Sequence, residues 1–296
     1  MSVPETEKQV GMMVRPKSEP PGLAQVVTTI RPPTRWPGLG LSEIWRYRRI
    51  CLVLARRNLM VRYRQTAIGA AWVILQPLLL MLVFTVFFGV MARLPTEHLP
   101  FPVFYLLGLL PWMMVNKILT EGATSVVNNS SLVTRVYFPP IYFPTSVAIA
   151  SLVDLAFGFV VLGVFLALFG IIPGVTLLVT PVLILIALIT SLGVTYWLSA
   201  LDVAYRDVTQ MLPFLSTLWM FGSPIIYPST IVVEPYRTWY WLNPISLVVE
   251  GFRWALGNIA PPPPEAWIIG VTVAVTLFVS GFFFFRYRER NFADHV

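Results

Sequence analysis

Few residues of this chain have side chains that could perform acid–base, nucleophilic or metal chemistry. The two histidines, His98 and His295, are far apart, and no His, Asp or Glu cluster has the spacing of a metal site. The single cysteine, Cys51, excludes an intrachain disulfide. The chain contains no G-x-x-x-x-G-K-[ST] phosphate-binding motif. The sequence therefore predicts a protein that is not an enzyme and holds no metal or nucleotide itself.

Three charged residues are expected within apolar stretches. Asp154 falls near the middle of one of them, where an acid is costly and by default suggests an ion path or a substrate contact. We favour the alternative of a protonated or hydrogen-bonded acid that fixes helix packing, because no second membrane acid is present to relay protons. Lys117 and Glu121 are four residues apart near the end of another stretch, where they can pair with each other. We interpret them as structural.

Composition indicates an integral membrane protein. Hydrophobic residues make up 56% and charged residues 12% of the chain, whereas charged residues approach about a quarter of a typical soluble domain. The formal net charge of +7 could suit nucleic acid, but the basic residues cluster beside apolar stretches. That position favours anionic lipid headgroups as the counter-charge. We therefore expect membrane lipids, and no nucleic acid, among the partners.

The N-terminal region divides into a polar tail and a basic amphipathic segment. Residues 1–40 lack a continuous apolar stretch and are expected to form a mobile cytoplasmic tail. Residues 41–66 interleave tryptophan and aliphatic residues with arginine, which is typical of a helix lying at anionic headgroups. The alternative is a plain basic flank of the first span. The arginines assigned to this interface helix are Arg46, Arg49, Arg56, Arg57, Arg62 and Arg64.

Apolar stretches long enough to cross a bilayer, which takes about 20 helical residues, follow this segment. The six expected spans are residues 68–92, 101–120, 142–169, 176–201, 208–227 and 267–285. Loop arginines gather on one side, which is then the cytoplasmic side, and both termini lie there. The expected fold is thus an all-α integral membrane protein of the cell membrane. Its transmembrane domain covers residues 67–290, and residues 291–296 are a cytoplasmic C-terminus.

Residues 125–141 are a polar island between two apolar stretches. Ser130 can cap a short helix, and Pro139 must stop it because proline lacks the backbone N–H. We expect a helix over about 128–138 that lies across the cytoplasmic membrane surface. In that position a soluble partner protein could dock on the helix and displace it. An ordinary polar loop fits the composition equally well.

Residues 228–265, between the fifth and sixth expected spans, are too apolar for a free loop and too interrupted by proline for another span. Irregular backbone at membrane depth survives only when it is buried in protein or lines water. We expect two short re-entrant helices, over about 228–260, that line a pore mouth. The alternative is a peripheral aromatic belt.

The order of several short motifs resembles one known family. They are YRQTAIGAAW at 63–72, QPL at 76–78, RVYFP at 135–139, SPIIYP at 223–228, and NPI at 243–245 followed by Glu250 and Arg253. Together they resemble the permease subunit of type-2 ATP-binding-cassette exporters of polysaccharides such as O-antigen and teichoic acid. The resemblance covers about residues 41–292.

The resemblance implies a homodimer that assembles with two copies of a separate ATPase. ATP and Mg would be bound by that partner, with no cofactor in this chain. The substrate would be a lipid-linked polysaccharide, O-antigen ahead of teichoic acid, moved to the outer face of the membrane. The polar island would be the coupling helix, with Asn129, Ser130, Leu132, Val133, Arg135, Val136, Tyr137, Phe138 and Pro139 facing the ATPase.

The resemblance also assigns residues to the gate through which the substrate leaves and to the channel through which it moves. The expected gate region contains Trp239, Tyr240, Trp241, Asn243, Pro244, Glu250 and Arg253. Sugar rings stack on aromatic planes, so aromatic residues are the candidates for a substrate channel: Phe84, Phe87, Phe88, Phe104, Tyr105, Trp112, Phe214, Trp219, Phe221 and Tyr227. The first and fifth spans are expected to line this channel at the dimer interface.

Three other functions stay open from the sequence. A type-2 exporter of a small drug or lipid would share the coupling helix without needing an aromatic channel. A membrane-embedded envelope transferase would need clustered carboxylates and histidines, which the sequence does not show. Secondary transport is usually marked by inverted repeats or paired intramembrane charges, and we find no convincing repeat.

Overall fold

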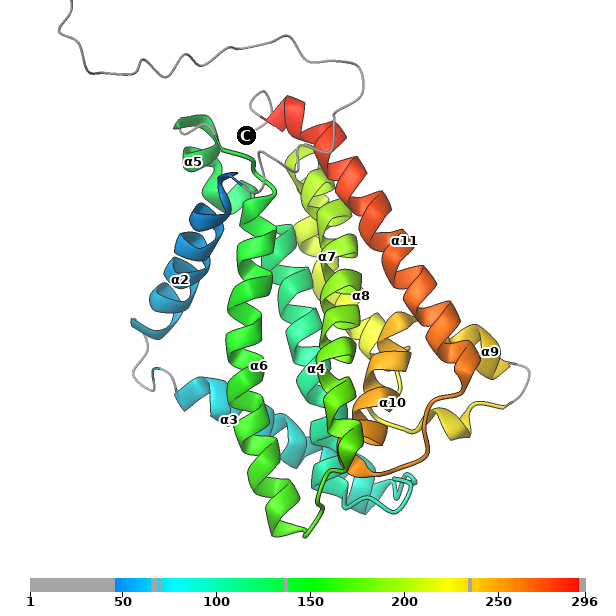
Figure 1. Cartoon of the computed structure of the whole chain (residues 1–296). Coiled ribbons are helices and arrows are strands. Elements are labelled where there is room, and N and C mark those ends of the chain that lie inside the picture. The colour runs from blue at the N-terminus through cyan, green and yellow to red at the C-terminus, as the bar shows by residue number, and fades with distance from the viewer. Residues whose placement is uncertain (1–45, 65–68, 70, 136–137, 234–235, 293–296) are drawn as a thin grey trace, which may run out of the picture. The chain divides into compact units, whose positions relative to one another are not determined.

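The computed structural model of the chain describes residues 46–64, 69, 71–135, 138–233 and 236–292. The regular elements of these residues are helices, with no strand among them, which confirms the all-α class (Figure 1). The predicted tail over residues 1–40 lies outside the described residues, as do Val136 and Tyr137 of the predicted coupling helix.

Five helical stretches of the described residues are long and apolar enough to cross a membrane. They are Ala71–Met91, Phe101–Ala123, Tyr142–Leu168, Val175–Ala204 and Pro264–Arg288. Each overlaps a predicted span. Four of them contain the single helices α4 (Phe101–Ala123), α6 (Tyr142–Leu168), α7 (Thr180–Ala204, preceded by the 3-10 turn η3, Val175–Val179) and α11 (Pro264–Arg288).

The first of these stretches changes helix type along its length. It begins as α3 (Ala71–Phe84), which contains Pro77, and continues as the π-helix η1 (Thr85–Met91). Proline removes a backbone donor inside a helix, and π-helical turns widen it. This element is therefore the least regular of the five.

The predicted fifth span corresponds to a shorter helix. α8 covers Asp207–Phe221, which is 15 residues, and Gly222 caps its C-terminus. Pro224 follows closely, and proline disfavours helical backbone at the residue before it. The apolar stretch therefore continues beyond the helix as irregular backbone, and the predicted count of six spans is not confirmed.

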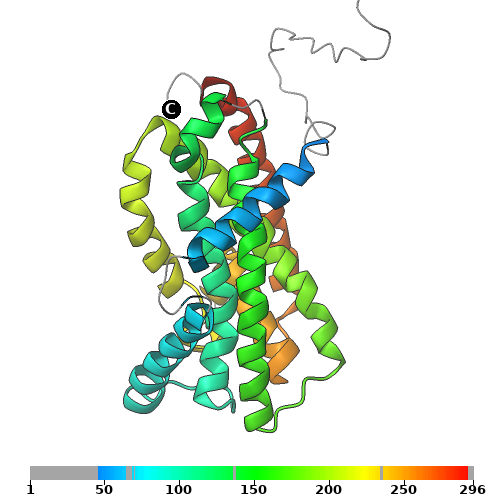
Figure 2. The ribbon, with the colours of Figure 1, turned by 90° about the vertical axis from the view of Figure 1, so that its left-hand side faces the viewer.

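The helix α4 lies at the centre of the described bundle. It contacts α3, α6, α7, α8 and α10 (Pro244–Gly257), and 78% of its most apolar window is buried (Figures 1 and 2). The other four stretches are 22–39% buried and leave large apolar side chains exposed. Such exposed surface is normal for helices that face lipid or a second subunit.

The helices α7 and α11 pack closely because glycines lie at their contact. A Cβ atom added to Gly281 would lie 2.1 Å from the carbonyl oxygen of Gly193. Small residues let two helices approach until their backbones touch, which is a common arrangement in membranes. This contact fixes the last helix against the bundle.

Two short segments lie at opposite ends of this unit (Figure 1). The short helix α5 (Ser130–Arg135), preceded by η2 (Val127–Asn129), lies at the same end as the C-terminus of α11. The helix α10 and the short α9 (Tyr236–Tyr240) lie toward the other end. The polar island and the interrupted segment therefore lie toward opposite ends of the bundle.

Candidate functional site

The helix α2 (Arg48–Arg64) packs on α6 through a narrow face. Cys51, Leu54 and Ala55 are buried there, whereas Leu52 and Val53 are more than half exposed. The predicted arginines Arg46, Arg49, Arg56 and Arg57 are exposed, and the side chains of Arg62 and Arg64 are outside the described part. An exposed surface that mixes arginine with leucine and valine suits a helix at the headgroup level.

A contact joins α2 to the polar island. The Arg57 guanidinium donates a hydrogen bond to the Asn129 side-chain oxygen, and Asn129 donates to the Ser125 carbonyl oxygen at 2.7 Å. On the same helix, Asn58 donates to the Ser146 hydroxyl at 3.1 Å. The island is therefore linked both to α2 and, through its own backbone, to the end of α4.

Apolar contacts hold the rest of the island against the bundle. Leu132 and Phe138 pack on a buried cluster that includes Tyr142, Phe143 and residues of α2, α7 and α11. The rings of Phe138 and Phe143 are 5.3 Å apart, and Pro139 is buried. Ser130 is half-buried, and the side chains of Val133 and Arg135 are outside the described part. A short helix anchored in this way can pass displacement to α2, α4 and α6.

Two predicted gate residues, Glu250 and Arg253, form a buried network around α10. Arg253 is fully buried and lies 3.3 Å from the Glu250 carboxylate. Arg253 also donates to the Ile225 carbonyl oxygen at 3.0 Å, while Glu250 accepts from the Ser229 backbone N–H at 2.7 Å. The pair thereby satisfies the backbone of the irregular segment that follows α8. Buried charges survive only with partners of this kind.

Asn243 fixes the beginning of α10. Its side-chain oxygen accepts from the Ile245 backbone N–H at 3.1 Å and from the Trp219 indole at 2.9 Å. Its amide nitrogen donates to the Ser223 hydroxyl at 2.8 Å. One N-cap residue therefore joins the start of α10 to the end of α8, and Pro244 follows it at the first helical position.

The predicted aromatic gate residues differ in exposure. Trp239 is 71% exposed, whereas Trp241 is buried. The Tyr240 hydroxyl donates to the Tyr227 hydroxyl at 3.2 Å, across the segment that Arg253 and Glu250 hold. Two short helices, α9 and α10, lie within the segment where the sequence predicts two, and α10 is buried against the rest of the bundle. That they re-enter the membrane and line a pore mouth stays a prediction.

The channel candidates separate into core and surface residues. Phe84, Phe104, Tyr105 and Trp112 are buried and pack on one another or on their neighbours, so in this structure they contact protein. A buried ring can reach a passing polymer only after repacking. Phe87, Phe214 and Phe221 are exposed, and Phe88, Trp219 and Tyr227 are partly buried. The channel assignment of the buried four therefore gains no support here.

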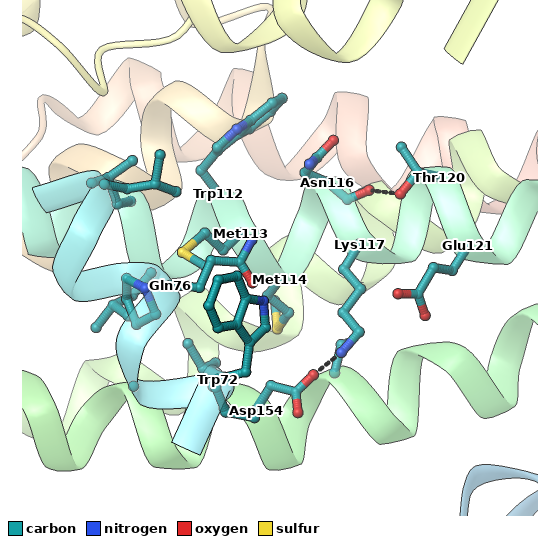
Figure 3. A pocket seen from close by; sticks show the side chains of 18 of the residues that line it. Trp72, Gln76, Trp112, Met113, Met114, Asn116, Lys117, Thr120, Glu121 and Asp154 are labelled. Atoms are coloured by element: carbon teal, nitrogen blue, oxygen red, sulfur yellow. Dashed lines mark hydrogen bonds and ion pairs between the residues drawn. The ribbon is translucent and has the colours of Figure 1, made fainter. Parts of the chain in front are cut away.

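An ion pair that the sequence did not reveal joins α4 to α6. Lys117 binds the Asp154 carboxylate, 37 positions further along the chain, and both side chains are mostly buried (Figure 3). The sequence pattern suggested Glu121 as a partner of Lys117, and the structure shows Asp154 bound to Lys117. Asp154 is thus held between two helices, in agreement with the packing alternative. The pair borders a cavity that is also lined by Gln76, from the QPL motif, and by Asn116, which the sequence did not single out.

These features define a class of protein: an all-helical membrane protein with a short polar helical segment at one end and a broken-helix segment toward the other. Residues 49–257 match the ABC-2 type transporter family, and the chain belongs to that family.

Named relatives are similar to the chain over most of its length. It is 32% identical over 259 residues to the O-antigen export system permease protein RfbA of Myxococcus xanthus, covering 86% of this chain and 98% of the relative. It is 23% identical over 205 residues to the Klebsiella pneumoniae protein of the same name, covering 69% and 78%. It is 27% identical over 240 residues to the polysialic acid transport protein KpsM of Escherichia coli, covering 79% and 91%.

Proposed function

We propose that this chain is the transmembrane subunit of an ATP-driven exporter that moves a lipid-linked polysaccharide, O-antigen ahead of teichoic acid, to the outer face of the cell inner membrane. The single observation that carries the proposal is the similarity to export permeases along nearly the whole chain. The relatives are named for O-antigen export and polysialic acid transport, which favours a polysaccharide over a small drug or lipid.

The exposed face of α8 supports a path for a polymer. Large apolar residues follow it at spacings of three and four, and each is more than half exposed: Met211, Phe214, Leu218 and Phe221. Such a stripe lies along one side of a helix. Phe214 and Phe221, together with the exposed Phe87 of η1, offer aromatic faces for weak contacts with a moving glycan, and Met211 and Leu218 extend the apolar surface. We propose that this stripe faces the path at the interface of a homodimer.

Energy comes, in this proposal, from two copies of a nucleotide-binding ATPase that carry ATP and Mg. The ATPase docks on the polar island, on the cytoplasmic side together with both termini. The contacts of Leu132, Phe138 and Asn129 with the bundle give that docking a mechanical connection to α2 and α6. We also propose that α10 and the irregular segment that follows α8 lie where the glycan leaves the membrane.

Co-purification tests the proposal first. A tagged chain is extracted from native membranes in mild detergent, and its stoichiometric partners are identified by mass spectrometry. We expect a second copy of the chain and a nucleotide-binding subunit. Recovery of the chain without an ATPase, under several gentle conditions, would contradict the proposal and favour secondary transport or an envelope transferase.

Charge reversal tests the coupling segment. We expect Arg135→Glu to abolish glycan export and glycan-stimulated ATP hydrolysis, with insertion and dimerisation unchanged. The control is Arg290→Glu, which makes the same charge change on an exposed side chain at the same end of the unit. Normal export by Arg135→Glu, or an equal loss in the control, would count against a specific docking role for the island.

A further inference from the structure

The turn between α6 and α7 exposes large apolar side chains. Residues 169–179, which we call the tip, form this turn at the end of the bundle away from the polar island (Figure 1). Ile172 is 83% exposed, Val175 84% and Leu178 75%. A cluster of exposed apolar side chains marks a surface that contacts a membrane or another protein.

The tip and the helices beside it carry no charge over a long distance. From Leu155 to Leu201 the sequence contains no Asp, Glu, Lys, Arg or His. The loop between η1 and α4, at the same end of the bundle, instead carries Arg93, Glu97 and His98. Hydrocarbon excludes charged side chains, whereas water and headgroups accommodate them. The composition of the two turns therefore indicates different surroundings.

The backbone at the start of the tip forms its hydrogen bonds within the protein. Gly170 has a φ of 66° and ends α6. Its N–H donates to the Ala167 carbonyl oxygen at 3.2 Å, and the N–H of Ile171 donates to the Leu166 carbonyl oxygen at 2.9 Å. This pair of bonds satisfies carbonyls in the last turn of the helix. Irregular backbone survives away from water only when its polar groups are satisfied in this way.

Side chains join the tip to the end of α10. Asn258, which caps α10 in the left-handed conformation, donates its amide to the Ile172 carbonyl oxygen at 2.9 Å. The Thr176 hydroxyl donates to the Ala255 carbonyl oxygen at 3.0 Å. One carbonyl of the tip and one from the last turn of α10 thereby have partners other than water. The position of the tip in the membrane therefore also sets the position of the end of α10.

The exposed apolar surface continues from the tip along both helices. Spacings of three and four residues keep these side chains on one face of each helix. They are Val160, Val164 and Leu168 on α6, and Leu178, Val182 and Leu185 on η3 and α7, each about half exposed or more. Both helices belong to stretches that are apolar enough to cross a membrane. The surface of the tip is therefore continuous with the surface of two spans.

The length of α6 leaves two positions for the tip. The helix has 27 residues and is therefore about 40 Å long, whereas the hydrocarbon of a bilayer is about 30 Å thick. An upright α6 would carry the tip into headgroups or water, and a tilted α6 would keep it in hydrocarbon. Tilting has a modest cost, and it removes three large aliphatic side chains from water. The balance favours the tilted helix.

We propose that the tip is immersed in the hydrocarbon of the leaflet farther from the polar island, and that it anchors the end of α10 there. The partner of this surface is the acyl chains of membrane lipids. The inference goes beyond the proposed function, and only the name of the leaflet rests on it. In the proposed orientation this is the outer leaflet, which receives the exported lipid.

Spin labels test the position of the tip. The full chain, purified with its partners in lipid nanodiscs and carrying Cys51→Ser, is labelled at one site at a time: Ile172→Cys, Val175→Cys or Leu178→Cys. Electron paramagnetic resonance compares collisions with oxygen, which concentrates in hydrocarbon, and with a nickel complex that stays in water. The references are His98→Cys, in the charged loop at the same end, and Leu185→Cys, on the exposed face of α7. We expect the oxygen-to-nickel ratio at the three tip sites to exceed that at His98→Cys several-fold and to approach that at Leu185→Cys.

A charged substitution separates immersion from a fixed apolar contact. Val175→Lys changes an exposed side chain, so folding should be kept. It should draw the tip toward water and raise nickel collisions at the Leu178→Cys label several-fold, because lysine is costly in hydrocarbon. The matched control, His98→Lys, should leave that label unchanged.

Two results would overturn the immersion of the tip. Nickel collisions at all three tip sites equal to those at His98→Cys would place the tip in water. Protection from both reagents, with immobile spectra, would show that a second copy of the chain or another protein covers it.

This proposal and the exporter proposal fail in different ways. A tip in water, in a chain that co-purifies with an ATPase and exports glycan, overturns the immersion and leaves the exporter intact. An immersed tip in a chain with no ATPase partner supports the lipid contact and overturns the proposed source of energy.

Discussion

The guanidinium carbon of Arg253 lies 3.6 Å from the centre of the Phe104 ring. Arg253 belongs to α10 and Phe104 to the central helix α4, and neither has measurable exposure to solvent. A desolvated cation over an aromatic face is attracted by the ring quadrupole. This contact adds to the bonds of Arg253 with Glu250 and Ile225, so α10 holds the segment after α8 against α4.

Breaking the Glu250–Arg253 pair should be costly. Removing one partner of a buried ion pair destabilises a protein by about 3–5 kcal/mol, because the other charge stays buried and uncompensated. We expect Arg253→Leu and Glu250→Gln each to lower the melting temperature of the purified subunit in detergent. Proteolysis between residues 222 and 231 should become faster, since Arg253→Leu removes the donor to the Ile225 carbonyl oxygen and Glu250→Gln replaces the carboxylate that accepts from Ser229 with a weaker, neutral acceptor.

A control and a double variant make this prediction specific. Glu265→Gln removes an exposed acid from the first turn of α11 and should cost less than about 1 kcal/mol. The double variant Glu250→Gln with Arg253→Leu should lose less than the two single losses added together. Strict additivity, or a loss in the control equal to that in the single variants, would show that the pair is not the source of stability.

The contact of α7 with α11 depends on the missing side chain of Gly281. An added Cβ would lie 2.1 Å from the Gly193 carbonyl oxygen, so Gly281→Ala should force the two helices apart. Gly163→Ala is a matched control, because nothing lies within 4 Å of its Cβ position. There the better helix propensity of alanine should stabilise by up to about 1 kcal/mol. Melting temperatures that shift in the same direction for both variants would contradict this picture.

Asn243 makes two kinds of bond that can be separated by substitution. Asn243→Asp keeps the acceptor for Ile245 and Trp219 but loses the donor to Ser223. Asn243→Ala loses all of them, and N-cap loss alone costs about 0.5–2 kcal/mol. We therefore expect the order of thermal stability to be wild type, then Asp, then Ala. An Ala variant as stable as the wild type would show that the cap does not hold α8 and α10 together.

Much of the fold could be predicted from the sequence because each membrane-spanning helix requires a long apolar stretch, which is easily recognised. α4 and α6 begin at the predicted residues 101 and 142. The early end of α8 was also encoded, in Gly222 and Pro224, but hydropathy alone carried the predicted span to residue 227. The end of a helix is set by residues such as glycine and proline, which change the backbone conformation, and not by the end of the apolar stretch.

The faces of the helices could not be predicted in the same way. Phe104 and Phe214 are both aromatic residues of apolar segments, yet one is fully buried and the other is 69% exposed. Lipid and protein interior are both apolar, so the sequence pattern does not mark which side faces inward. For the same reason the sequence did not reveal Asp154 as a partner of Lys117. That contact depends on the rotation of α4 against α6.

Cys51 offers a probe of how tightly α2 is held. Burial raises the pKa of its thiol from 9.0 to about 11, because the thiolate is penalised away from water. Only the thiolate reacts with alkylating agents, so at pH 8 Cys51 should react about 100-fold more slowly than a thiol of ordinary pKa. Raising the pH should increase the rate about tenfold per unit up to about pH 10, whereas an ordinary thiol levels off near pH 9.

The matched control moves the cysteine by one residue. Leu52 is 57% exposed, so Leu52→Cys in a Cys51→Ser background should react fast and level off at the lower pH. Alkylation is followed by mass spectrometry on the assembled chain. If α2 detached freely from α6, the buried and the exposed cysteine would react at similar rates. The hydrogen bond from Arg57 could then not hold the polar island in a fixed position relative to α6. A large and persistent difference in rate would show that α2 stays packed on α6. This packing is required if a displacement of the polar island is to reach α6 through α2.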